Sequence, residues 1–102
     1  MNKRIRKKKG LSKIRPEEVW GLYDTLAKYI LPRLHKFKEV NVNSYPQGFS
    51  SIEEWHNTID KMIWSFEIVI KDDWSTRDAL ADIKRYEEGM ALFAKYFRDL
   101  WD

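Results

Sequence analysis

The chain of 102 residues contains two histidines and no cysteine, so thiolate metal sites are excluded and histidine–carboxylate sites are the ones to consider. Glu53 and His56 have the Glu-x-x-His spacing that places two ligands on one helix face in di-iron bundles. Such a site needs the motif twice with two further carboxylates, whereas here it occurs once and Pro32 stands where His35 would need its glutamate. We therefore predict no metal site and interpret His56 as a solvated or boundary histidine beside Trp55.

Signatures of catalysis are also missing from the sequence. It has no Ser-His-Asp signature, no G-x-S-x-G elbow, no phosphate-binding loop and no dinucleotide fingerprint, and its four glycines are not clustered. The carboxylate pairs Asp72–Asp73 and Glu87–Glu88 are sequence neighbours, which point about 100° apart around a helix and so do not make an acid–base pair. We predict a protein that is not an enzyme and needs no cofactor.

A group of cationic and aromatic side chains between residues 29 and 45 is the best candidate for ligand binding. Arginine holds phosphate through two parallel hydrogen bonds. Pro32 is expected to kink or break the helix that carries this group, which would leave free N–H groups near Arg33 for an anion. The alternative is that these cations complement a helix C-terminus and stay in water. The predicted contacts to an anionic ligand such as a signalling nucleotide are Tyr29, Arg33, His35, Lys36, Lys38 and Tyr45.

Charge divides the chain into two parts. Residues 1–15 carry eight Lys or Arg and no acid, so the other 87 residues hold 11 Lys or Arg against 16 Asp or Glu. This pattern predicts a flexible basic arm at 1–15 on a mildly acidic domain at 16–102. Because the arm has no interleaved aromatic residue and no DNA-reading module behind it, we predict only weak, non-specific contact with nucleic acid or another polyanion. The residues involved would be Lys3, Arg4, Arg6, Lys7, Lys8 and Lys9.

The candidate residues lie on helices, because apolar residues repeat at intervals of three and four over three segments. The expected helices run from about 17 to 41, from 52 to 72 and from 76 to 101. Two or three such helices must bury their apolar faces against each other. The predicted fold is therefore all-α, a three-helix antiparallel bundle.

Three local signals refine this fold. Ser51 followed by Glu54 is a capping-box pattern, which marks the start of the second helix. The sequence Tyr45-Pro46-Gln47-Gly48 predicts a type I turn before it. Gly89 falls in the middle of the third helix, where glycine costs about 1 kcal/mol relative to alanine. We therefore expect another helix to cross closely at Gly89.

Five tryptophans are more than a three-helix core of this size can easily shield. Wide apolar helix faces are commonly shared between chains, so we predict a homo-oligomer. If the protein instead binds a host protein through an exposed aromatic face, the candidate protein-interface residues are Trp64, Trp74 and Trp101. No apolar run approaches the roughly 20 residues that cross a bilayer, and no apolar region follows the basic start. We expect no membrane span, no secretion signal and a cytoplasmic location.

Three blocks of the sequence occur in a fixed order: WGLYDTLAKYILPRLHKFKE, EEWHNTIDKMIWSFE and EGMALFAKYFRDLWD. They resemble a family of small helical proteins encoded by tailed bacteriophages and prophages, most of them uncharacterised. The resemblance covers residues 18–102 and leaves the basic arm outside. It implies a phage accessory protein acting in the cytoplasm of a bacterial host, and it brings no catalytic residues with it.

Three hypotheses about function follow. The first is a phage protein that counters host defence by binding, in the form of an oligomer that sequesters an anionic signalling nucleotide. The second is an inhibitor that binds a host protein through an exposed aromatic helix face. The third is an accessory protein that binds nucleic acid non-specifically through the basic arm.

Overall fold

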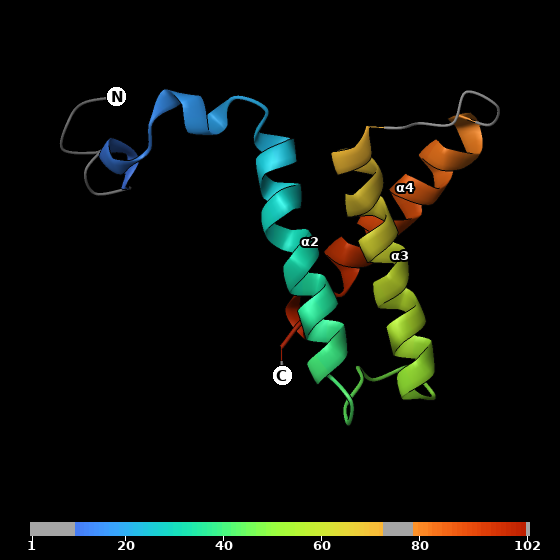
Figure 1. Ribbon diagram of the computed structural model, residues 1–102. Coiled ribbons are helices and arrows are strands. Elements are labelled where there is room, and N and C mark those ends of the chain that lie inside the picture. The colour runs from blue at the N-terminus through green and yellow to red at the C-terminus, as the bar shows by residue number, and fades with distance from the viewer. Residues whose placement is uncertain (1–9, 73–78, 102) are drawn as a thin grey trace.

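The computed structural model describes residues 10–72 and 79–101. In these residues the chain forms three α-helices and no β-strand: α2 (Leu22–Val40), α3 (Ile52–Lys71) and α4 (Ala79–Lys95) (Figure 1). Short 3-10 helices accompany them: η1 (Leu11–Lys13), η2 (Pro16–Val19) and η3 (Phe97–Asp99). The prediction of an all-α fold with three helices is confirmed. The six predicted polyanion contacts between Lys3 and Lys9, the candidate interface residue Trp74 and the predicted helix start at residue 76 lie outside the described residues.

α3 is the central helix and carries most of the core. Its buried apolar side chains repeat at helical spacing, as the sequence predicts: Trp55, Ile59, Met62, Ile63 and Phe66. Both α2 and α4 pack on α3, whereas the backbones of α2 and α4 do not approach each other in the described part of the chain. Figure 1 shows α4 crossing behind α3 at an oblique angle, with the first half of α2 standing apart from both. One side of the helix assembly is therefore open.

The α3–α4 contact is close because Gly89 lies directly against Ser65. Both residues are buried, and a β-carbon at Gly89 would overlap the Ser65 hydroxyl and the Lys61 carbonyl oxygen. Ser65 Oγ lies 3.2 Å from the Lys61 carbonyl oxygen and 3.0 Å from that of Tyr86, so its hydroxyl donor is shared between the two helices. The predicted close crossing at Gly89 is confirmed.

The segment between α2 and α3 agrees with the capping prediction but not with the turn prediction. Ser51 is the N-cap of α3, and its Oγ accepts a hydrogen bond of 3.1 Å from the Glu54 N–H. The turn lies one residue later than expected, because the Phe49 N–H donates to the Pro46 carbonyl (3.3 Å). Gly48 thus takes the third position with φ of 103°, which is a type II requirement, so the predicted type I turn is wrong.

The first predicted helix is divided, but the division lies before Gly21 instead of at Pro32. Pro16–Val19 forms η2, and Gly21 adopts a φ of 61° as the N-cap of α2. From Leu22 to Val40 the helix is continuous through Pro32, so the predicted break there, with its free N–H groups, is wrong.

Packing on α3 explains why α2 tolerates this proline. Proline removes one hydrogen bond and crowds the preceding turn, at a cost of about 3 kcal/mol. Ala27 and Leu34, on either side of Pro32, are buried in the core and hold both halves of α2 to α3. Arg33 folds back along the helix and donates from Nη1 to the Tyr29 carbonyl oxygen (2.9 Å), whereas the carbonyl that Pro32 leaves without its helical donor is that of Lys28.

The third predicted helix ends earlier than expected. α4 stops at Lys95, and the chain tightens into η3 instead of continuing to 101. Tyr96 has left the helical region, with φ of −105° and ψ of 16°, and its ring lies 5.6 Å from Trp55 and 5.2 Å from Phe49. Packing of this ring at the base of α3 accompanies the end of the helix.

Candidate binding groove

The residues predicted to bind an anion lie in three separate places. Tyr29 and Arg33 are together: the guanidinium carbon of Arg33 lies 3.7 Å from the centre of the Tyr29 ring. Arg33 also donates a hydrogen bond to the Tyr29 carbonyl, so one N–H group of its guanidinium is already bonded to the backbone of its own helix. These two residues line a shallow hollow between α2 and the region of α4 and η3.

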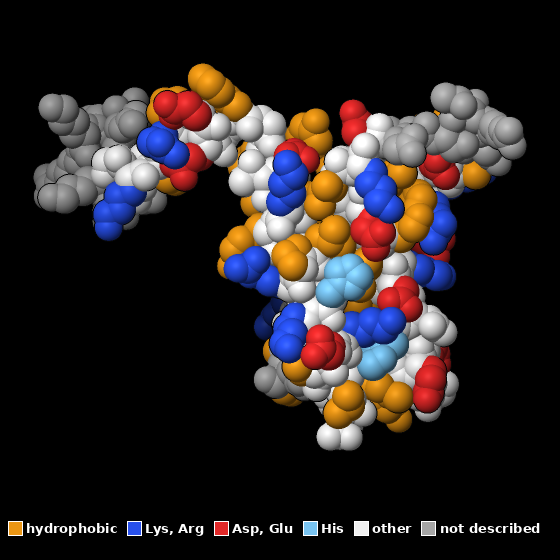
Figure 2. Space-filling view, in the orientation of Figure 1, with side chains coloured by type: hydrophobic (Ala, Val, Ile, Leu, Met, Phe, Trp, Pro, Cys, Tyr) orange, Lys and Arg blue, Asp and Glu red, His pale blue; other side chains and the backbone are white. Residues whose placement is uncertain are grey.

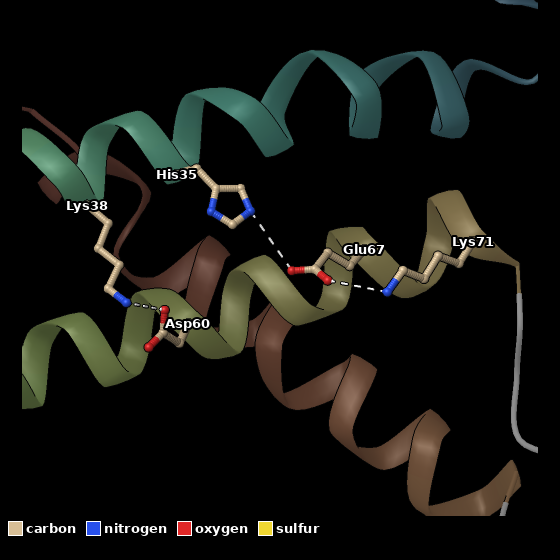
Figure 3. Close-up of polar contacts among 5 residues, drawn as sticks. All are labelled: His35, Lys38, Asp60, Glu67 and Lys71. Carbon is tan, nitrogen blue, oxygen red and sulfur yellow. Dashed lines mark hydrogen bonds and ion pairs between the residues drawn. The ribbon is translucent and has the colours of Figure 1, made fainter.

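The other cations of α2 face carboxylates (Figure 3). Lys38 Nζ lies 2.7 Å from Asp60 Oδ1 on α3, and His35 Nε2 lies 3.9 Å from Glu67 Oε1, also on α3. Lys36 Nζ lies 3.2 Å from Glu39 Oε1 within α2. Figure 2 shows charged and histidine side chains gathered over this face of α2 and α3. Lys36 and Lys38 are thus partly neutralised by neighbouring acids, and the contacts of His35 and Lys38 join α2 to α3.

Tyr45 lies in the loop after α2, beside a different and much smaller hollow. This hollow holds only about 60 Å³, and Tyr45 shares it with Trp55 and Trp101 among others. The structure therefore brings Tyr29 and Arg33 together, keeps His35 and Lys38 on the α3 side, and leaves Tyr45 apart. No single cavity in the described residues unites the predicted anion site.

A wide apolar hollow lies where α2 diverges from α3 and α4. It encloses about 490 Å³, within the usual range for binding sites. A second hollow of about 390 Å³ continues it toward η3, because Ile30 and Phe93 line both. We call the two together the apolar groove. Its walls are formed mainly by Tyr23, Leu26, Ala27, Ile30, Phe66, Val69, Met90 and Phe93.

One wall of the apolar groove is strongly exposed. Tyr23, Leu26 and Tyr29 on the first half of α2 are all exposed, as is Trp20 just before it, with 71% of its surface accessible. Apolar side chains are visible at the surface between α2 and α3 in Figure 2. The three-and-four spacing in the sequence predicts that Trp20, Tyr23 and Leu26 belong to the apolar face of the first helix, together with Ile30, Leu34 and Phe37. This apolar face extends further toward the N-terminus than the part of α2 that α3 covers. The length of the apolar face is the sequence signal that could have indicated an uncovered groove.

The candidate interface tryptophans differ in their surroundings. Trp101 is exposed, with 72% of its surface accessible, as an interface residue would be. Trp64 is half-buried, and the guanidinium carbon of Arg85 lies 4.1 Å from its ring centre. A cation over an indole ring stabilises the pair by about 0.5–1 kcal/mol at exposed sites. Trp64 is therefore partly covered within the chain, and Trp101 is open to a partner.

His56 connects α3 to the end of α2. It is half-buried, and its Nε2 donates to the carbonyl oxygen of Asn41, the C-cap of α2, at 2.6 Å. Among the described residues no three His, Asp or Glu side chains gather in a way that could hold a metal ion. His56 therefore forms a hydrogen bond that connects α3 to the C-terminal end of α2.

One carboxyl group has a displaced pKa. The Glu54 carboxylate accepts hydrogen bonds from the Ser50 hydroxyl (2.5 Å) and from the Ser50 N–H (3.0 Å). These two bonds, the hydroxyl first, lower the pKa of Glu54 below its ordinary value of 4.5. Glu54 lies at the start of α3, away from the apolar groove, so this shift concerns helix stability and not ligand binding.

Comparison of the chain with protein-family models, with curated proteins and with solved structures finds no match in any of the three. The resemblance to small phage proteins therefore stays a prediction. No helix in the described part of the chain is both long and apolar enough to span a membrane.

Proposed function

We propose that this protein is a non-enzymatic binding protein that takes an amphipathic helix of a partner protein into the apolar groove. The observation that carries the proposal is the groove itself: two continuous hollows of about 490 and 390 Å³ with largely apolar walls. An exposed apolar groove between helices is a recurrent way to bind an amphipathic helix. Large exposed apolar surfaces on small proteins mark interaction sites.

Charge supports an apolar partner face over a polyanion as the ligand of this groove. The first half of α2 carries one acid and one cation, and these pair with each other, with Asp24 Oδ2 2.8 Å from Lys28 Nζ. Burial of this first half therefore leaves neither of its two charges unpaired, and Arg33, the cation of α2 at the edge of the groove, is exposed to water. The resemblance of residues 18–102 to phage proteins supports a host protein of the bacterial cytoplasm as the partner, which the binding would inhibit.

Affinity capture from bacterial lysate tests this function with two matched variants. Leu26 and Val40 lie on the same helix with nearly equal exposure, 49% and 47%, but only Leu26 lines the apolar groove. We expect the wild type and Val40→Lys to retain one partner in stoichiometric amount, and Leu26→Lys to lose it. Equal capture by all three proteins, or capture by none, contradicts the proposal.

A second candidate is binding of an anionic nucleotide, which the Arg33–Tyr29 pair favours. Arg33 has no carboxylate partner among the described residues, and it rests on an aromatic ring at the edge of the groove. Calorimetry with cyclic and ADP-ribose-type nucleotides tests it. Binding that disappears in Arg33→Glu and persists in Lys36→Glu would support it, and absence of binding across the panel would reject it.

A further inference from the structure

We infer that, in the protein alone, a second copy of this chain fills the apolar groove, with the first half of α2 of each copy lying in the groove of the other. This inference rests on the proposed function, since it names an occupant of the same groove. The arrangement is a two-fold dimer, in which each copy supplies both the groove and the helix that enters it.

The shape of one chain supplies the first argument. The first half of α2 is at once a wall of the groove and an apolar ridge that, in the part of the chain that the structure describes, stays exposed at its outer end. Tyr23 and Leu26 are exposed although they face the groove, and Trp20 continues the ridge beyond the helix start. A second α2 laid antiparallel against the first would cover both ridges with one contact. A foreign helix would cover only one copy.

Surface area supplies the second argument. Along the first half of α2 and the residue before it, Trp20, Tyr23, Leu26 and Tyr29 keep between 49% and 71% of their surfaces accessible. A specific interface requires about 800 Å² from each partner. Contiguous large apolar side chains that stay exposed are typical of such interfaces.

Charge supplies the third argument. The two halves of α2 differ: Lys36 and Lys38 in the second half face Glu39 and Asp60, and the Lys38–Asp60 pair holds this half to α3. The first half carries only the Asp24–Lys28 pair, which is neutral as a unit. Two copies of the first half can therefore approach in antiparallel orientation without net repulsion. The half that is free to associate has no net charge, whereas the second half carries Arg33, Lys36 and Lys38 against Glu39 alone.

Such a dimer would also regulate the groove. A partner helix and a second copy compete for the same apolar walls, so partner binding should weaken as the concentration of the protein rises. The competition is a direct consequence of using one surface twice.

Sedimentation equilibrium of the full chain tests the inference. We expect the wild type and Val40→Lys to reach twice the monomer mass of 12.4 kDa. For Leu26→Lys we expect the dimer dissociation constant to rise at least about tenfold, since a lysine would be buried in an apolar contact. Circular dichroism of Leu26→Lys should keep the helical signal because the residue is half exposed. A wild type that stays monomeric, or dimers that Leu26→Lys leaves unchanged, overturns the inference.

The absence of cysteine from the sequence allows a second, positional test. Under mild oxidation, Leu26→Cys should form a covalent dimer because the two α2 helices cross near this residue, and Val40→Cys should not. Equal cross-linking at both positions contradicts the arrangement. The two proposals remain separable: a monomer whose partner capture still depends on Leu26 rejects only the dimer, and a dimer that captures no partner rejects only the proposed function.

Discussion

α3 is contacted in two different ways by its two neighbours. α4 crosses it backbone against backbone at Gly89, with the Ser65 hydroxyl between the two helices and no room for a β-carbon. α2 is fastened to α3 along its second half, by the buried Leu34 and by ion pairs such as Lys38–Asp60, and diverges along its first half. The first contact leaves no space for a ligand. The second creates the apolar groove.

The difference shows how one small core can serve both stability and binding. Close packing at the α3–α4 crossing fixes the position of α4, because neither helix can approach or slide without a clash. The α2–α3 contact includes buried Ala27 and Leu34, but the larger side chains Tyr23 and Leu26 near the start of α2 stay exposed, so that end stays available. We therefore expect stability to depend mainly on the α4 side and association on the α2 side.

Removing the largest buried side chain on the α4 side should have the largest effect. Trp55 is 1% exposed, and its ring packs edge to face against Phe49 (5.1 Å) and Tyr96 (5.6 Å). Trp55→Ala should lower the free energy of unfolding by about 3–5 kcal/mol, because it removes a buried aromatic and leaves a cavity. Urea denaturation measures this. Trp101→Ala, at an exposed tryptophan, should change it by less than about 0.5 kcal/mol, and equal losses would contradict the assignment of the core.

Filling the crossing should have the next largest effect. Gly89→Ala improves helix propensity by about 1 kcal/mol, yet its β-carbon would overlap Ser65 and the Lys61 carbonyl oxygen. Because overpacking costs about 1–3 kcal/mol or more, we expect net destabilisation in thermal or urea unfolding. Adding Ser65→Ala should not restore stability, since the Lys61 carbonyl remains. A Gly89→Ala protein more stable than the wild type would mean that the helices can separate freely.

The polar fastening of α2 should contribute much less. Lys38 Nζ and Asp60 Oδ1 are 2.7 Å apart, but both side chains are substantially solvated. A double-mutant cycle with Lys38→Met and Asp60→Asn should give a coupling below about 1 kcal/mol. The coupling should shrink further in high salt, which screens exposed charges. A coupling of several kcal/mol that salt does not alter would place this ion pair among the main determinants of the fold.

The sequence predicts the α3 side of this comparison better than the α2 side. The stripe from Trp55 to Phe66 is buried, Ser51 caps α3, and Gly89 lies at a close crossing, all as predicted. Each of these features depends on the spacing of apolar residues or on the type of a single residue, such as a serine cap or a glycine at a crossing. A single sequence is therefore enough to predict them.

Predictions that depended on competition between local and tertiary effects were less successful. Pro32 alone favours a break in the helix, but burial of Ala27 and Leu34 on either side outweighs it. The apolar face of α2 is predicted by the spacing of its residues, but nothing local shows that α3 and α4 cover only part of it. The candidate anion residues share a stretch of sequence, and their separation depends on which acids α3 presents to α2.

The smallest predicted effect concerns pH and the start of α3. Because hydrogen bonds from Ser50 lower the pKa of Glu54 in the folded protein, they stabilise the fold above the ordinary pKa of 4.5. This contribution disappears as the pH falls through the lowered pKa of the folded state. Ser50→Ala should therefore be slightly less stable than the wild type at pH 7 and equally stable in strong acid.

The neighbouring residue provides the control for that pH dependence. Ser51 Oγ accepts from the Glu54 N–H (3.1 Å), a bond that does not involve the carboxylate. Ser51→Ala should lose about 1 kcal/mol of stability at either pH, as expected for removal of an N-cap. Thermal unfolding of both variants at pH 7 and in strong acid distinguishes the two roles. A Ser50→Ala deficit that persists at low pH would show that Ser50 acts through packing and not through the charge of Glu54.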